Sequence, residues 1–345
     1  MSSNLNAAPY PIIRQPAPRL RRWLLAGLAG LVLLGAGHAL LWAWLAGRME
    51  TELAGWVAER RAQGWQVQHG TPQRGGWPWA VRLTMPAVQL AEPGGLGWQG
   101  ETLALSLALP LPRHLALAAS GSQALVAGPA RLPFRATSLT GSVPLAGHPV
   151  RLQAEAVRAE VVGGPLLLRR AALVLPQEGA FDLALEGLAP PGLPPAALAL
   201  GPEVQFMGIQ GMLTAPLPTG ATPAMQAAAW RNAGGRLDLR ALDLTWGPVQ
   251  AGAQGELALD AALQPTGRLT LTLAGLREGL AALSAAGVIE PGNARTLLAL
   301  GSMLQRTPPE GGPPSLRLPL VLRDRTLAVA GFTLMKLAPV VWPAQ

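Results

Sequence analysis

The chain has 345 residues, of which half are hydrophobic and only 13% are charged, so it has ample apolar material to fold and is no disordered polyelectrolyte. Cysteine is absent, which excludes disulfides, thiolate metal sites, a cysteine nucleophile and an acylated lipoprotein cysteine. The formal net charge is +8, and half of it comes from Arg14, Arg19, Arg21 and Arg22 in the N-terminal tail. Because no basic run alternates with aromatic residues, we expect no nucleic-acid partner.

The first predicted element is a membrane-spanning helix from Trp23 to Leu45, a stretch without a formal charge. At about 1.5 Å per residue such a helix is roughly 35 Å long, enough to cross a bilayer. Trp23 lies at one end and Trp42 and Trp44 at the other, as expected for the two membrane interfaces. The four tail arginines precede the span. The positive-inside rule therefore places residues 1–22 in the cytoplasm and the main domain on the other side of the membrane.

A cleaved signal peptide is the main alternative for this stretch. Signal peptides have an apolar region of about 7–15 residues and a small-residue cleavage site. Here the apolar region is longer, and its Trp-rich end offers no such site. Arg21 and Arg22 also suggest twin-arginine export, but the flanking residues match that signal poorly.

Small residues recur at every fourth position of the span, and His38 lies on the same side. This candidate helix-packing stripe consists of Gly35, His38, Ala39, Ala43 and Gly47. A second helix approaches closely where such residues line up, so self-association or docking to another envelope protein is one interpretation. A span rich in Gly and Ala also produces this spacing by chance.

Residues 46–64 show the spacing of a short amphipathic helix that continues the anchor or rests on the membrane surface. Trp56 belongs to it, and Trp65, Trp77 and Trp79 follow closely. These four aromatics are candidates for contact with the membrane surface. The alternative is a local aromatic core where the helix meets the sheet.

From about residue 66 the hydrophobic period changes to two, so residues 65–345 are expected to form a β-rich domain. Leu alternates in segments such as 103–109, 236–246, 256–263 and 268–275. Gly- and Pro-containing turns separate the segments at intervals too short for crossover helices, which favours an antiparallel, meander-like sheet, rolled or folded into a sandwich. A helix-turn-helix insertion is predicted at about 276–306, followed by a hairpin that turns near Asp324.

One face of the predicted strands is almost uniformly Leu. Such a face must be covered by helices, by another sheet or by a ligand, and few helices are available. Two outcomes stay open: a closed sandwich whose Leu faces pack together, and a partly open groove that accepts acyl chains.

Sequence motifs give no catalytic, cofactor-binding or metal site. Gly95, Gly97 and Gly100 match a dinucleotide-binding pattern, but a strand rather than a helix is expected after them, so we interpret them as a turn. Lys336 is the only lysine and lies in no phosphate-binding loop. The remaining candidates are scattered or belong to alternating strands: His69, His114, His148, the pair Asp238 and Asp243, and the pair Glu256 and Asp260.

The order of the features resembles a family of uncharacterised proteobacterial proteins, domain of unknown function 2125. The likeness rests on an N-terminal anchor, a helix that ends in RAQGWQV, the segment RGGWPWAVRLTMPAVQL and, much later, LDLTWGPVQAGAQGELALD. The C-terminal LRLPLVLRDRTLAVAGFTLMKLAPVV also resembles the repeating β-segments of AsmA-like envelope proteins, whose apolar grooves are associated with lipid movement. The first resemblance implies no activity, and the second is an analogy of fold.

These observations together lead us to expect a non-enzymatic, single-pass protein of the bacterial inner membrane with its main domain in the periplasm. A lipid or another apolar ligand would bind to the Leu-lined sheet. The alternative is a scaffold that binds another envelope protein through the helix stripe and the sheet. A hydrolase is the third and least favoured class.

Overall fold

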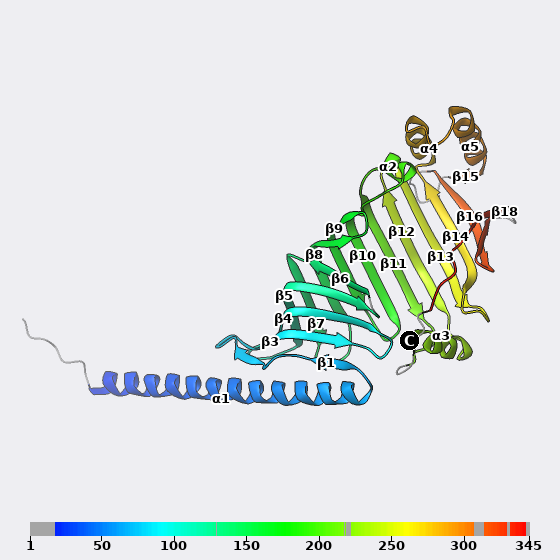
Figure 1. Ribbon diagram of the computed structural model, residues 1–345. Coiled ribbons are helices and arrows are strands. Elements are labelled where there is room, and N and C mark those ends of the chain that lie inside the picture. Colours follow the sequence, from blue (N-terminus) through cyan, green and yellow to red (C-terminus); the bar gives the residue numbers. More distant parts are fainter. Residues whose placement is uncertain are drawn as a thin grey trace, which may run out of the picture.

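The computed structural model describes residues 18–128, 130–216, 218, 222–306, 314–329 and 332–342. One helix, α1 (Pro18–Ala62), precedes a single antiparallel sheet to which all the described strands belong. The two helices predicted at 23–45 and 46–64 are therefore one continuous element. In Figure 1, the C-terminal part of α1 lies beside the first strands, and its N-terminal part projects beyond them.

The first half of the sheet contains ten strands. They are β1 (Gln66–Gln68), β2 (Gln73–Gly75), β3 (Ala80–Ala91), β4 (Leu96–Ala108), β5 (His114–Ala127), β6 (Ala130–Arg135), β7 (Ser138–Pro144), β8 (Val150–Val161), β9 (Gly164–Leu175) and β10 (Ala180–Ala189). Strands β1 and β2 both pair with β3. Strands β6 and β7 both pair with β5 on one side and with β8 on the other. The other neighbours are consecutive in the chain, as expected for a meander.

The second half continues the meander and carries the remaining helices. Its strands are β11 (Val204–Leu213), β12 (Leu237–Trp246), β13 (Val249–Leu259), β14 (Pro265–Ala274), β15 (Gln305–Arg306), β16 (Ser315–Arg323), β17 (Thr326–Val329) and β18 (Phe332–Lys336). Helices α4 (Leu276–Ala285) and α5 (Pro291–Leu304) lie between β14 and β15 in the chain. In Figure 1 the strand direction turns progressively from β3 to β14, as the twist of an open sheet requires.

Two short helices were not predicted. They are α2 (Pro195–Leu200) and α3 (Pro223–Asn232), and each follows a Pro-rich segment that we interpreted as a turn alone. Proline at the first helical position fits a helix start, because that position needs no N–H donor. In α3 the hydroxyl of Thr222 also accepts a hydrogen bond from the Met225 N–H, which caps the helix.

Two local predictions are confirmed by the backbone. Strand β4 follows the turn at Gly95, as predicted, whereas the dinucleotide-binding motif needs a helix there. Gly97 and Gly100, which we interpreted as part of the turn, lie in β4 itself. Asp324 and Arg325 form the turn between β16 and β17, and both have positive φ, 49° and 61°. Positive φ at both central residues is the geometry that matches the twist of a two-residue hairpin.

Candidate functional site: an open apolar face beside the anchor helix

The junction between α1 and the sheet is fixed by two side-chain hydrogen bonds from the apolar part of the helix. Trp42 donates its indole N–H to the Ala80 carbonyl oxygen at 2.8 Å. The Nε2 atom of His38 lies 2.8 Å from the Pro78 carbonyl oxygen, and Nε2 must be the donor because a carbonyl oxygen only accepts. The segment Pro78–Ala80 is thereby fixed at the same height along the helix axis as residues 38–42 of α1.

Aromatic rings strengthen the same junction. The Trp77 ring lies 5.0 Å from the His38 ring and 6.0 Å from the Trp42 ring, the latter in an edge-to-face arrangement. Such pairs are typically worth about 0.5–1.5 kcal/mol beyond the area they bury. Further along, Ala46 and Met49 of α1 are buried against β3, where Leu83 is also buried.

The predicted helix-packing stripe is divided by this junction. His38 faces the sheet domain, whereas Ala39 and Ala43 are exposed. A Cβ atom built on Gly35 or Gly47 meets no atom within 4 Å. Docking of another helix along the exposed part of the stripe stays a prediction.

The four candidate aromatics also fall into two groups. Trp77 and Trp79 precede β3; the Trp77 ring contacts His38 and Trp42, whereas Trp79 is exposed. Trp56 and Trp65 flank Arg60, whose guanidinium lies 5.7 Å and 5.8 Å from their ring centres. Since Trp56 is 14 residues beyond Trp42, the second group lies about 20 Å further along the helix.

The Leu residues of successive strands align in register on one face of the sheet, which we call the Leu face. Directly opposed residues of neighbouring strands point to the same side. One such row runs through Leu83, Leu105, Leu117, Gly141, Leu152, Leu173, Leu183, Ile209, Leu242, Ala253, Leu271 and Leu318. No member of this row, from β3 to β16, is polar.

A second, adjacent row extends the Leu face with the same chemistry. It runs through Met85, Leu103, Ala119, Leu139, Ala154, Ala171, Leu185, Met207, Leu244, Ala251, Leu273 and Leu316. The row between them, on the opposite face, contains small and polar residues such as Thr84, Thr140, Gln153, Asp243 and Arg317. The sheet is therefore strongly two-sided.

Burial varies along the Leu face although its composition does not. Leu83 under α1 is 0% exposed and Leu105 is 8% exposed. In the middle, Leu117, Leu173 and Leu183 are only half-buried, and Leu152 is 40% exposed. In β16, Leu316 and Leu320 are buried again. The middle of the sheet is thus a single layer, and no second sheet covers its apolar side among the described residues, so the closed sandwich is wrong. A groove that accepts acyl chains stays a prediction.

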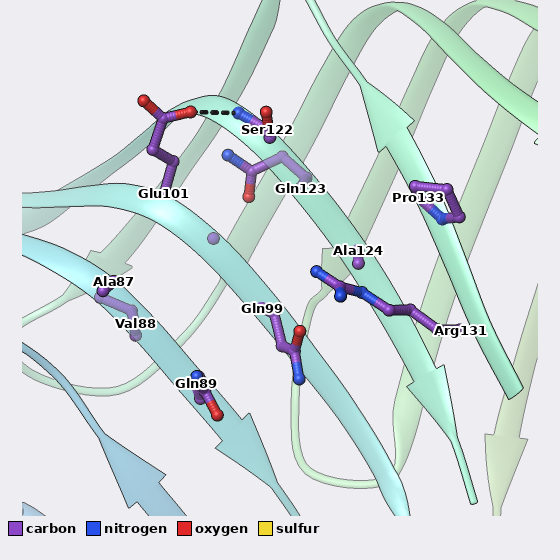
Figure 2. A pocket seen from close by; sticks show the side chains of 11 residues that line it. Ala87, Val88, Gln89, Gln99, Glu101, Ser122, Gln123, Ala124, Arg131 and Pro133 are labelled. Carbon is purple, nitrogen blue, oxygen red and sulfur yellow. Dashed lines mark hydrogen bonds between the residues drawn. The ribbon is translucent and has the colours of Figure 1, made fainter. Parts of the chain in front are cut away.

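A polar depression of about 260 Å³ lies at the irregularity where β4 meets β5 (Figure 2). Its charged residues are Glu101, which accepts a hydrogen bond from the Ser122 N–H at 2.9 Å, and Arg131. The side chain of Gln123 is buried there, and its Oε1 atom has no partner among the described residues. No ion pair joins Glu101 to Arg131 in the described part of the chain.

The three histidines outside α1 lie on separate segments. His69 follows β1, His114 begins β5 and His148 lies between β7 and β8. Within the residues that the structure describes, no three His, Asp or Glu side chains are grouped so that they could hold a metal ion.

Beyond the apolar part of α1, one ion pair ties the helix to the sheet. The Arg74 Nε atom donates to Glu50 Oε1 at 2.7 Å, and a second hydrogen bond joins the same two side chains. The hydrogen bond from Arg74 lowers the pKa of the Glu50 carboxyl below its ordinary value. The pair joins α1 to β2.

Together these features define a β-sheet protein with one N-terminal helix that is long and apolar enough to span a membrane. The chain belongs to a bacterial family described as an uncharacterized protein conserved in bacteria (DUF2125), whose model matches residues 42–338. No curated protein and no solved structure matches the chain. The resemblance to the first family is thereby confirmed, whereas the AsmA-like analogy gains no support.

Proposed function

We propose that this protein is anchored in the inner membrane by α1, keeps its sheet on the periplasmic side and binds the acyl chains of lipids on the Leu face. The role is one of binding and not of catalysis. A single observation carries it: an apolar cross-strand row continues from the buried Leu83 to half-buried residues that no second sheet covers in the described part of the chain.

The dimensions of the open part suit acyl chains. From β5 through β7 to β14 the Leu face crosses nine strands, which at about 4.8 Å per strand spacing is roughly 38 Å. An acyl chain is about as long as one leaflet of the hydrocarbon core is thick, about 15 Å. One acyl chain therefore covers less than half of the open part of the Leu face. A half-exposed apolar surface of this kind gains stability from any chain that excludes water from it.

Site-specific photocrosslinking tests the proposal, because adjacent residues of one strand face opposite sides. A photoreactive amino acid is placed at Leu183 or Leu242 on the Leu face, and at Ala184 or Asp243 as matched controls on the opposite face. The full-length variants are reconstituted in vesicles of phosphatidylethanolamine and phosphatidylglycerol that contain an alkyne-tagged phospholipid.

We expect lipid adducts at positions 183 and 242 and few at 184 and 243. Native mass spectrometry of the unmodified protein should show bound phospholipid, and the double substitution L183Q/L242Q should reduce it. Equal labelling of both faces, or no labelling at either Leu position, would contradict lipid binding on the Leu face.

A further inference from the structure

Three loops lie side by side at the end of the sheet next to the apolar part of α1. They are residues 76–79 before β3, 109–113 between β4 and β5, and 145–149 between β7 and β8. The Leu109 N–H donates to the Trp79 carbonyl oxygen at 2.8 Å, and the Leu145 N–H donates to the Arg113 carbonyl oxygen at 3.0 Å. These backbone hydrogen bonds join the three loops into one edge.

This edge presents large apolar side chains to the outside. Trp79 is 80% exposed, Leu111 77%, Leu145 55% and Trp77 51%. The loops contain no acidic residue, and Arg113 is exposed among them. Aromatic and aliphatic side chains next to a basic residue suit the boundary between acyl chains and anionic headgroups.

The contacts with α1 fix the depth of the edge relative to the membrane. Trp42 and His38, which hold Ala80 and Pro78, lie three and seven residues before Leu45, the end of the uncharged stretch. At 1.5 Å per residue this places the loops about 5–10 Å inside that end of the span. The apolar faces of interfacial segments are buried to a similar depth of about 5–10 Å.

We propose that these three loops form a second membrane contact, in which the end of the sheet docks into the bilayer that α1 spans. The docked edge brings the nearby end of the Leu face to the acyl region, so that chains pass between bilayer and sheet without crossing water. This inference rests on the anchoring role of α1 within the proposed function. It does not depend on which ligand binds in the middle of the sheet.

The absence of cysteine makes a direct test possible. Single variants W79C, L111C and L145C of the full-length protein are labelled with an environment-sensitive NBD fluorophore in the same phospholipid vesicles. V162C is the matched control, because Val162 is fully exposed in the β8–β9 turn at the opposite end of the strands. L34C, in the middle of the uncharged stretch of α1 and 76% exposed, reports whether the anchor is inserted.

We expect emission at positions 79, 111 and 145 to shift to shorter wavelengths. Quenching there by lipids with a spin label on the acyl chain should be roughly threefold or more that at position 162. Quenching at position 34 with none at the three loop positions would overturn the docking while leaving the anchor intact. Quenching at position 79 alone would overturn the three-loop contact. An unquenched position 34 would overturn anchoring and docking together.

The test separates this inference from lipid binding on the Leu face. Labelled positions 79, 111 and 145 lie in exposed loops, so their substitution should leave the fold intact, which the circular dichroism spectrum of each variant checks. Quenching at the loops without crosslinking at position 183 would support docking and contradict lipid binding on the Leu face. Crosslinking at position 183 without quenching at the loops would support lipid binding and contradict docking.

Discussion

Leu83 and Leu152 belong to the same cross-strand row and point to the same face of the sheet, but their surroundings differ. Leu83 is fully buried next to Ala46 and Met49 of α1, whereas Leu152 is 40% exposed. The alternation of side chains along a strand determines to which face of the sheet each one points. Whether that face is buried depends on a second layer, here the helix α1. The comparison separates the stabilising core of this protein from its candidate binding surface.

The largest expected effect comes from shortening Leu83, with Leu152 as the comparison. L83A should destabilise the protein by about 2–5 kcal/mol, because a cavity remains in a packed region, and L152A by well under about 1 kcal/mol. Urea denaturation of the full-length protein in mild detergent, followed by circular dichroism, measures both. Equal losses would show that the middle of the sheet is covered as fully as its α1 end.

The next comparison concerns two tryptophans of α1. Trp42 donates a hydrogen bond to the sheet, and Trp44 is 65% exposed. W42F removes the donor and leaves the Ala80 carbonyl oxygen without it, which should cost about 1–3 kcal/mol. W44F should change stability by less than about 0.5 kcal/mol, since it lacks such a contact. The same denaturation experiment measures both, and a cost for W42F no larger than for W44F would contradict a role of the hydrogen bond at the junction.

Sequence reasoning succeeded where the pattern is local. Alternating Leu predicted the antiparallel strands, and the short turns predicted the meander, because period and turn length depend on neighbouring residues only. The hairpin at Asp324 was found for the same reason. Helices α2 and α3 were missed because proline-rich segments were interpreted as turns; Thr222 followed by Pro223 and an Ala-rich run was the available signal for α3.

The site required information that the sequence does not contain. An open and a closed Leu face have the same alternation, so only the arrangement of distant elements could decide between them. Likewise, the sequence predicted a helix contact for His38, but its partner is Pro78, 40 residues away. Trp42 was predicted at the membrane interface, but its partner is Ala80, 38 residues away. Long-range contacts of this kind follow from tertiary structure and not from spacing.

The smallest expected effect concerns the ion pair between Glu50 and Arg74, which joins α1 to β2. Arg74 lowers the pKa of Glu50 in the folded protein, so the pair stabilises the fold at pH values above the ordinary pKa of a glutamate. This stabilisation is lost as the pH falls through the lowered pKa, because the protonated carboxyl no longer pairs with Arg74. Both side chains are partly exposed, so the contribution is small and salt should reduce it.

Thermal unfolding of the wild type and of E50Q across the acidic range measures this contribution. The difference between their midpoints should be constant near neutral pH and shrink below pH 4.5, the ordinary value for the Glu50 carboxyl. E52Q is the matched control, because Glu52 pairs with Arg48 inside α1 and not with the sheet. A midpoint difference for E50Q that stays unchanged down to the lowest pH would show that the ion pair contributes nothing to holding α1 against β2. The junction would then depend on the hydrogen bonds of His38, Trp42 and Arg61 and on the buried apolar residues.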